Sequence, residues 1–286
     1  MNDAGTATAT NPNIGGAGDD PVTLDRPSVA VVVIALNEAA RIAHCLKSAT
    51  FADEIVLIDA GSGDDTVRIA RECGARVYTY ADWQGFGVQR SRALAHVESD
   101  YVFWLDADEV VTPTLAQQIL ACLNGVRDGR TFDAASMRWQ PFAYGRMLRH
   151  YREQQWNLRL IRRALLAGYD GVVHEAPVWR SGEAPEAIRL RGRLEHHTRE
   201  SVASTLAKVR QYAILGARKR REAGRRGGVL RGMAAATRVF VLHYFGRLAC
   251  LSGGAGFLFA QSLAHEAFFK YAILGYDSDV ALARRD

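Results

Sequence analysis

The first hundred residues alternate between short apolar runs and segments whose apolar positions recur at helical spacing. The β-branched runs "SVAVVVIAL" and "EIVLIDA" predict strands, whereas "NEAARIAHCLKSA" and "DDTVRIARECG" predict helices. The alternation continues through "ARVYTY", "QRSRALAHV" and "YVFWLDA", after which Thr112 and Pro113 predict the start of another helix. Continuously apolar strands that alternate with helices indicate a largely parallel sheet covered on both faces.

The pattern changes after Leu123. The segments "SMRWQPFAYG", "WNLRLIRR" and "AIRLRGRLEHHT" predict strands of a mixed extension of the sheet, which closes over the site. From Ser201 the chain turns helical, and two further helices are expected at about 229–250 and 256–274.

These patterns predict three parts. Residues 1–26 are small and polar and are expected to form a disordered leader. Residues 27–200 are expected to form the α/β catalytic domain, and residues 201–286 a helical region that associates with a membrane or an acceptor.

Three carboxylates follow the apolar strand in "DYVFWLDADE": Asp106, Asp108 and Glu109. Like charges repel, and burying them is costly unless something compensates, so the cluster either faces water or holds a cation. Carboxylates at positions i and i+2 suit Mg²⁺ or Mn²⁺, which in turn bind diphosphate oxygens. A polar turn that caps the next helix is the alternative.

Two other predicted strands also end in polar residues, at Asn37 with Glu38 and at Asp59. Ligands of such sheets bind beyond the carboxyl ends of the strands, so these residues are expected along one edge. The glycines of "AGSGDD" do not form a dinucleotide fingerprint, because Thr66 occupies the third glycine position. A carboxylate before them would repel a pyrophosphate but suits the imide N–H of a base such as uracil; capping the next helix is the alternative.

Positive charge is concentrated in the last third of the chain. The net charge is +5, and Lys208 to Arg247 contains eleven Lys or Arg and one acidic residue, Glu222. This asymmetry predicts an anionic partner, either a membrane surface, a phosphorylated acceptor or nucleic acid, although for any single arginine a solvated helix face is the better interpretation. No nucleic-acid-binding motif accompanies the run, so we expect no nucleic acid.

The cysteines and the N-terminal segment indicate the compartment. Cys45, Cys73, Cys122 and Cys250 lack metal-binding spacing and fit a reducing cytoplasm, and the start lacks the features of a signal peptide. The uncharged stretch Leu248–Ala264 is at the lower limit of the roughly 17–25 residues that a membrane span needs. It also contains Gly, Ser and Gln, so interfacial association is favoured over a span.

Several motifs resemble the family 2 glycosyltransferases. In order, they are "VVVIALNEAARIAHCL", "ADEIVLIDAGSGDDTVRIA", "DWQGFGVQRSRAL" and "VFWLDADE". They are most similar to the subgroup of lipopolysaccharide core β-1,4-glucosyltransferases, and the similarity continues through "WNLRLIRR", "VHE" and "LEHHTRESVASTLAKVRQY", over about residues 28–275. The resemblance implies a GT-A fold with a Rossmann-like, mostly parallel sheet, a nucleotide-diphosphate sugar donor, a divalent metal and inversion at the anomeric carbon.

The resemblance also implies roles for individual residues of the nucleotide site. Asn37 and Glu38 would border the nucleotide pocket, and Asp59 would contact the base. Gln89 and Arg90 would lie near the diphosphate.

The same resemblance implies a metal site. Asp106 would face the ribose and the metal, and Asp108 would be the principal metal ligand. His174 and His196 would complete the metal site or contact the diphosphate; a structural role, the more frequent one for a lone histidine, is the alternative. Ser91 stands where the family usually has Asn, which places the local hydrogen bonding in question.

Inversion by a single displacement needs a general base other than the metal ligands. Glu175, in "GVVHEAP", resembles the family's "HE" position and is the expected base, with Glu153 and Asp170 as alternatives. One of three arginines is expected to reach phosphate while the others face solvent: Arg159, Arg162 and Arg163.

The sequence therefore predicts an inverting glycosyltransferase that moves glucose from UDP-glucose to a heptose of the lipopolysaccharide inner core. The acceptor would be lipid-anchored (lipid A–core), and the enzyme cytoplasmic and bound peripherally to the anionic inner face of the plasma membrane, where each Lys or Arg gains about 1 kcal/mol. Peptide, capsule or lipid-carrier acceptors are alternatives, and a non-catalytic sugar-nucleotide scaffold is the alternative from another class. A nucleotidyltransferase is disfavoured, because the first strand leads to "LNEAARI" and not to a glycine-rich phosphate loop.

Overall fold

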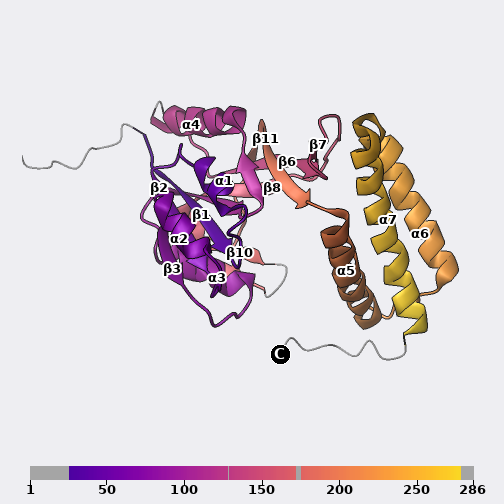
Figure 1. Cartoon of the computed structure of the whole chain (residues 1–286). Coiled ribbons are helices and arrows are strands. Elements are labelled where there is room, and N and C mark those ends of the chain that lie inside the picture. The colour runs from indigo at the N-terminus through magenta and orange to yellow at the C-terminus, as the bar shows by residue number, and fades with distance from the viewer. Residues whose placement is uncertain (1–25, 128, 172–174, 278–286) are drawn as a thin grey trace, which may run out of the picture.

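The computed structural model describes residues 26–127, 129–171 and 175–277. Over these residues the chain forms an α/β domain and, beside it, a group of three long helices (Figure 1). The leader predicted over residues 1–26 lies outside the described residues, apart from its last residue.

One half of the central sheet is parallel. Strands β3, β2, β1 and β4 lie side by side in that order and run in the same direction. Their bounds are, respectively, Arg76–Thr79, Glu54–Asp59, Val29–Ala35 and Tyr101–Asp106. Strands β1 and β4 are buried almost throughout, because helices cover this half on both faces.

Four helices cover the parallel half: α1 (Ile42–Lys47), α2 (Thr66–Glu72), α3 (Phe86–Leu94) and α4 (Pro113–Arg127). Apolar side chains of α1, α2 and α4 join one core cluster, and α3 joins the cluster on the opposite face of the sheet. Oγ1 of Thr112 accepts a hydrogen bond from the N–H of Leu115 at 3.3 Å, which confirms the predicted start of α4.

The other half of the sheet is mixed. After β4 come β8 (Asn157–Arg162), β6 (Ala134–Ala143), β11 (Ala187–Arg199) and β5 (Glu109–Val111), with β7 (Arg146–Met147) paired to β6. Strand β8 is antiparallel to both β4 and β6, whereas β6 and β11 are parallel. Strands β9 (Leu166–Asp170) and β10 (Ala176–Trp179) form a separate two-stranded sheet. The predicted mixed extension is therefore confirmed.

Strand β8 contains a bulge at Arg159. Ala135 of β6 pairs with Leu160. The next residue of β6, Ser136, pairs with Leu158, so Arg159 is the extra residue of the bulge. A bulge bends its strand and redirects the side chain that it carries, and this one directs a guanidinium toward the carboxyl end of β4.

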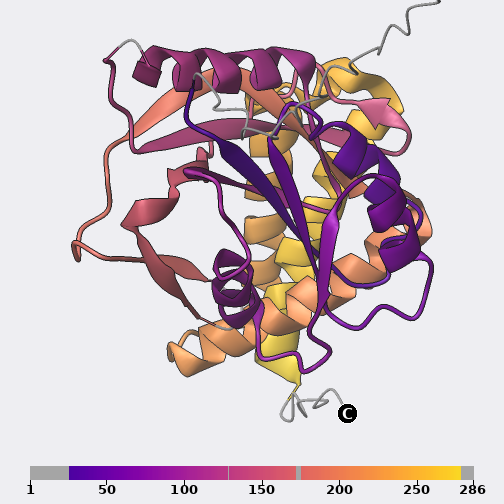
Figure 2. The same ribbon diagram turned by 90° about the vertical axis from the view of Figure 1, so that its left-hand side faces the viewer.

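The chain ends in three long helices: α5 (Val202–Glu222), α6 (Val229–Val241) and α7 (Gly253–Tyr276). Seen from the side of the α/β domain, α4 runs along the top of the view and the C-terminal helices lie behind the sheet (Figure 2). A third core cluster joins the two parts, with Leu148 and Tyr151 on the sheet side and Phe259 on α7.

The boundary between α6 and α7 differs from the prediction of helices over 229–250 and 256–274. A π-helical turn follows α6 over Leu242–Gly246, and Leu248 then adopts a left-handed conformation with φ of 61°. Helix α7 begins early, at Gly253, because the chain reverses tightly: a Cβ on Gly256 would lie only 1.9 Å from the carbonyl oxygen of Ala249.

The predicted architecture is confirmed: an α/β domain with a parallel, helix-covered half and a helical, basic C-terminal extension. Among the described residues, no helix combines the length and apolar character that crossing a membrane requires.

Candidate active site

The predicted site residues follow the carboxyl ends of three adjacent strands. Strand β1 lies between β2 and β4, and its Ala35 pairs with Asp59 while its Ile34 pairs with Asp106. Because the three strands are parallel, Asp59 and Asp106 lie along one edge of the sheet, as the sequence pattern predicts.

Asp106 is bonded to the arginine at the bulge. Its Oδ2 accepts a hydrogen bond from Nη2 of Arg159 at 2.7 Å, and the same Nη2 donates to Oε1 of Glu109 at 2.5 Å. Burial alone would raise the pKa of Asp106, but attraction to Arg159 and to Arg90 outweighs it and lowers the pKa. Asp106 is therefore ionised at neutral pH.

Glu109 is fully buried and holds the end of β4 in place. Its Oε2 accepts a hydrogen bond from the N–H of Asp106 at 2.9 Å, and its Oε1 accepts one from Nε1 of Trp139 at 2.6 Å. Burial raises the pKa of Glu109 to about 7, although Arg159 acts in the opposite direction. Sequence reasoning grouped Glu109 with the cluster but gave it no role, and it missed Trp139 altogether.

Arg90, on α3, lies at the centre of the site. Its Cζ lies 4.8 Å from the ring centroid of Trp104 and 5.5 Å from that of Tyr169. Its Nη2 lies 3.1 Å from Oε1 of Glu175 and 3.8 Å from Oδ1 of Asp106. Asp106 and Glu175, for which the sequence predicts different roles, therefore lie beside the same guanidinium, that of Arg90.

Asp108 lies beside a histidine. Its Oδ2 is 3.5 Å from Nε2 of His196, whose ring centroid lies 4.7 Å from that of Trp139. Burial would raise the pKa of Asp108, but His196 outweighs it and lowers the pKa. The carboxylate is partly exposed, so Asp108 offers a charged group at the surface of the site.

Asn37 and Asp59 shape the loop between β2 and α2. Asn37 has a left-handed backbone with φ of 56°, and its Oδ1 accepts a hydrogen bond from the N–H of Gly63 at 2.8 Å. Asp59 is buried, and its Oδ1 accepts a hydrogen bond from the N–H of Ser62 at 3.1 Å. This loop is therefore bonded to Asn37, the second residue after the end of β1.

Glu38 lies near the same edge and forms an ion pair. Its Oε2 is 2.5 Å from Nε of Arg41. Burial raises the pKa of Glu38, Arg41 lowers it, and the nearby charge of Asp108 raises it further.

Gln89 is not brought to the cluster. Its side chain is fully buried, and its Nε2 donates a hydrogen bond to the carbonyl oxygen of Tyr80 at 3.1 Å. Only Arg90 of the predicted pair reaches the strand edge. Ser91 bonds β9: its Oγ accepts a hydrogen bond from the N–H of Tyr169 at 2.8 Å.

The remaining predicted residues lie in other surroundings. Glu153 accepts a hydrogen bond from Nη1 of Arg247 at 3.4 Å, close to the C-terminal helices. Asp170 bonds the N–H of Gly171 at 2.7 Å. Of the three arginines, Arg159 faces the acidic cluster, whereas two are exposed: Arg162 and Arg163. His174 lies outside the described residues.

The described residues fit a metal that is completed by its substrate. Within residues 26–127, 129–171 and 175–277, no three His, Cys, Asp or Glu side chains are grouped closely enough to hold a metal ion by themselves. Mg²⁺ commonly binds one or two carboxylates and takes its other oxygens from substrate phosphates and water. The ionised carboxylates of Asp106 and Asp108 meet that requirement.

Comparison with known proteins identifies the family. Residues 30–177 match the model of glycosyl transferase family 2, which is more than half of the chain. The chain belongs to glycosyltransferase family 2. It is therefore an enzyme that transfers sugar residues.

Two relatives are similar to this chain over very different lengths. The lipopolysaccharide core biosynthesis glycosyltransferase LpsC of Rhizobium meliloti is 29% identical over 250 residues, which cover 85% of this chain and 90% of LpsC. An uncharacterized glycosyltransferase of Rickettsia felis is 37% identical over 92 residues, 32% of each chain, so this chain spans about a third of that relative.

Solved structures are more distant. Glucosyl-3-phosphoglycerate synthase from Mycobacterium tuberculosis, in complex with Mn²⁺, UDP and glucosyl-3-phosphoglycerate, has a TM-score of 0.43 and 21% identity, covering 63% of this chain and 75% of that one. TarS from S. aureus, in complex with UDP-GlcNAc, has a TM-score of 0.35 and 22% identity, covering 40% of this chain and 35% of that one.

Proposed function

We propose that this family 2 glycosyltransferase moves glucose from UDP-glucose to a heptose of the lipopolysaccharide inner core, with inversion at the anomeric carbon. The observation that carries the proposal is the meeting of Asp106, Arg90 and Glu175 at the carboxyl edge of the parallel strands. The relation to LpsC, over 85% of the chain, supports a saccharide acceptor of the same kind.

The donor would lie across the carboxyl ends of β2, β1 and β4. Its uracil would lie toward Asp59. The Asp59 carboxylate already accepts hydrogen bonds from the N–H groups of Gly61 and Ser62, and a carboxylate has about four acceptor positions, so one would be left for the imide N–H. Asn37 and Glu38 would border the nucleoside, and its diphosphate would lie toward Asp106 and Arg90.

A divalent metal would be held by Asp106 and Asp108, with His174 as a further candidate ligand. When bound, Mg²⁺ or Mn²⁺ would neutralise charge on the diphosphate. Arg90 would add a second cation on the same side. Its guanidinium is held by Trp104 and Tyr169, so little conformational freedom would be lost when it bonds a phosphate oxygen.

The transfer itself would be a single displacement. The acceptor oxygen forms a bond to the anomeric carbon while the bond from that carbon to the diphosphate oxygen breaks, and UDP leaves with the bonding electrons. Glu175 would take the proton of the acceptor hydroxyl. In the structure Glu175 pairs with Arg90, so a donor phosphate that attracts Arg90 would free the carboxylate for this task.

Release of UDP from UDP-glucose, with Mg²⁺ or Mn²⁺ present, tests the activity. Wild-type protein should turn over with a saccharide acceptor, and Asp108→Ala should lose most of this turnover. A non-catalytic scaffold would show no turnover in either protein.

Glu175→Gln tests the base. The variant should bind UDP normally and lose at least about a hundredfold in kcat, the usual range for a general base. A near-normal kcat would assign the base to another residue, with Glu153 and Asp170 next in order.

Peripheral attachment to an anionic membrane surface completes the proposal. Four apolar side chains of α6 and the turn after it are exposed by about half or more: Leu230 82%, Met233 55%, Val241 49% and Phe245 57%. The basic run from Lys208 to Arg247 lies in the same region and would attract anionic lipid. An exposed apolar stripe beside cations is typical of helices that lie in a membrane interface.

The acceptor is the least constrained part of the proposal. Peptides, capsule intermediates and lipid carriers present the same nucleophilic hydroxyl chemistry. Comparing the lipopolysaccharide core sugars of strains with and without this protein would separate them, because the core lacks one glucose in the strain without it only if the enzyme is a core glucosyltransferase.

A further inference from the structure

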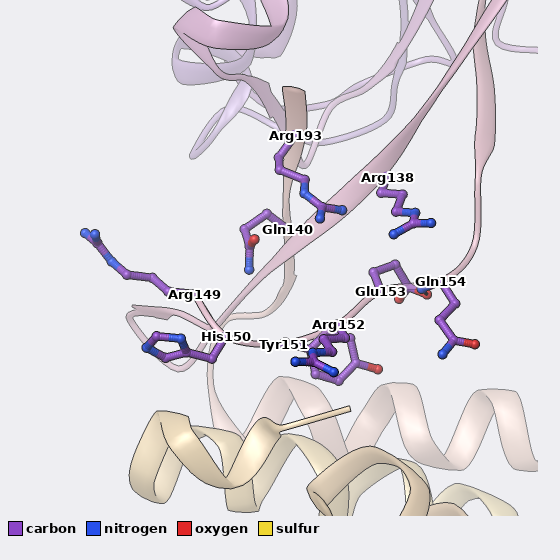
Figure 3. A pocket seen from close by; sticks show the side chains of 9 residues that line it. All are labelled: Arg138, Gln140, Arg149, His150, Tyr151, Arg152, Glu153, Gln154 and Arg193. Atoms are coloured by element: carbon purple, nitrogen blue, oxygen red, sulfur yellow. Dashed lines mark hydrogen bonds between the residues drawn. The ribbon is translucent and has the colours of Figure 1, made fainter. Parts of the chain in front are cut away.

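A cavity lies between the mixed half of the sheet and the C-terminal helices (Figure 3). Its volume is about 750 Å³, enough for one or two sugar rings. Four arginines line it: Arg138, Arg149, Arg152 and Arg193. The acidic residue of the lining is Glu153, which already accepts a hydrogen bond from Arg247.

The four arginines of this cavity have no ion-pair partner among the described residues. Among the described residues, no carboxylate lies within ion-pair distance of any of the four, although ion pairs are frequent elsewhere in the fold. Nε of Arg138 is buried and forms no hydrogen bond within the described part of the chain. A buried donor without an acceptor is costly, and a bound anion would supply one.

Arg138 and Arg193 are held together by the sheet. They are paired in the register of the parallel strands β6 and β11, so their side chains leave the same face side by side. The guanidinium of Arg138 stacks 4.2 Å from the ring centroid of Trp156, which fixes its position. Burial and the charge of Arg138 both lower the pKa of Arg193, so an anion between the two would relieve their repulsion.

The cavity faces the same side of the sheet as Asp106. Side chains alternate along a strand, so Arg138 lies on the face opposite the buried Met137, just as Asp106 lies opposite the buried Leu105. Strand β6 is two places from β4 in the sheet, a separation of about 10 Å. One oligosaccharide could therefore occupy both places.

We propose that this cavity binds an acidic group, a phosphate or a carboxylate, on the acceptor saccharide, and so positions the neighbouring sugar at the strand-edge site. This inference rests on the proposed function and names the chemical class of its acceptor. A concave cavity suits a single acidic sugar better than a flat membrane surface, and its position away from β1 and β2 separates it from the expected nucleotide site.

The test uses three probes that share one ring and differ in charge: glucose 6-phosphate, glucuronate and glucose. Their binding is measured by titration against the wild-type chain, Arg138→Gln/Arg193→Gln and the control Arg162→Gln, an exposed arginine of β8. UDP binding is measured in parallel with each protein.

We expect the wild type to bind at least one charged probe at least about tenfold more tightly than glucose, as bonds to a charged group allow. The double variant should lose about tenfold in affinity for that probe, and the control and the UDP affinities should stay within about twofold. The probe that binds more tightly, glucose 6-phosphate or glucuronate, identifies the acidic group as a phosphate or a carboxylate.

Three results would overturn the inference: equal binding of charged and neutral probes, unchanged binding in the double variant, or an equal loss of UDP affinity. If the double variant does not fold, Arg149→Gln/Arg152→Gln, which changes two exposed side chains, replaces it under the same criteria. Vesicles of anionic phospholipid are titrated in parallel, and a double variant that loses binding to the vesicles alone would be a fourth contrary result, in favour of a membrane contact. Failure of UDP to bind the wild type would refute the proposed function while leaving the cavity result intact.

Discussion

Nη2 of Arg90 lies 3.1 Å from Oε1 of Glu175, so a residue of helix α3 directly contacts the residue that precedes β10. The two carboxylates expected to act in donor binding and proton transfer, Asp106 and Glu175, thus share one cation. Without that cation they would repel, and the diphosphate would lose one of its positive contacts.

Arg90→Gln should therefore lower kcat/KM for UDP-glucose by about a hundredfold, because a charge-assisted contact to the leaving group is lost. Arg92→Gln is the matched control: Arg92 lies on the same helix and pairs with Asp82 at the surface. Its kcat/KM should stay within about twofold. Steady-state kinetics on both variants checks this, and equal effects of the two substitutions would refute the role of Arg90.

Arg159→Met should destabilise the fold by about 3–5 kcal/mol, because the fully buried Glu109 would lose the cation that compensates its burial, and the half-exposed Asp106 would lose the same partner. Arg162→Met removes an exposed guanidinium from the same strand and should cost less than about 1 kcal/mol. The free energy of unfolding in urea measures both. If Arg159→Met lowers the free energy of unfolding by less than about 1 kcal/mol, the guanidinium of Arg159 is not needed to stabilise the two carboxylates.

His243 should make the fold less stable in mild acid. Its Nδ1 and the hydroxyl of Tyr151 are 2.6 Å apart, and burial lowers the pKa of His243 to about 4 from its usual 6.5. As the pH falls from 6.5 toward 4, the unfolded chain takes up a proton that the folded chain resists, so stability present above pH 6.5 is lost.

Because the ring of His243 is partly exposed, we expect this loss to be about 2 kcal/mol, less than the full shift would give. His243→Asn should flatten the pH dependence of the unfolding free energy over that interval. The same slope in the variant and in the wild type would assign the acid sensitivity to other groups.

The apolar stripe of α6 should carry part of the membrane affinity. Leu230→Ser/Met233→Ser should lower binding to vesicles of anionic phospholipid by at least about tenfold, since two exposed side chains lose their apolar burial. Val178→Ser changes an exposed apolar residue of β10 and should leave vesicle binding unchanged. Sedimentation with vesicles gives the measurement, and equal binding of all three proteins would exclude this stripe as the contact.

Much of the α/β domain could be predicted from the sequence, because its signals are local. Continuous apolar runs predicted the buried parallel strands, and the polar residues after them predicted which edge carries the site. The position of Asp106 could be predicted from the general rule that ligands of parallel sheets bind beyond the carboxyl ends of the strands.

Other features depend on pairing between distant segments and left no local signal. The bulge at Arg159 arises from the register between β6 and β8, so the sequence could not show that this arginine, of three, turns toward Asp106. The same limit applies to Gln89, which follows the family motif yet packs inside, and to Glu109, whose buried bond to Trp139 joins segments 30 residues apart.

The central claim is that a divalent metal held by Asp106 and Asp108 binds the diphosphate of UDP. Equilibrium titration of UDP with and without Mn²⁺ tests it most directly. The wild type should bind UDP at least about a hundredfold more tightly with Mn²⁺ than without it, and Asp108→Asn should remove this difference while keeping the weak metal-free affinity. An Asp108→Asn variant that binds UDP with Mn²⁺ as tightly as the wild type would contradict the account.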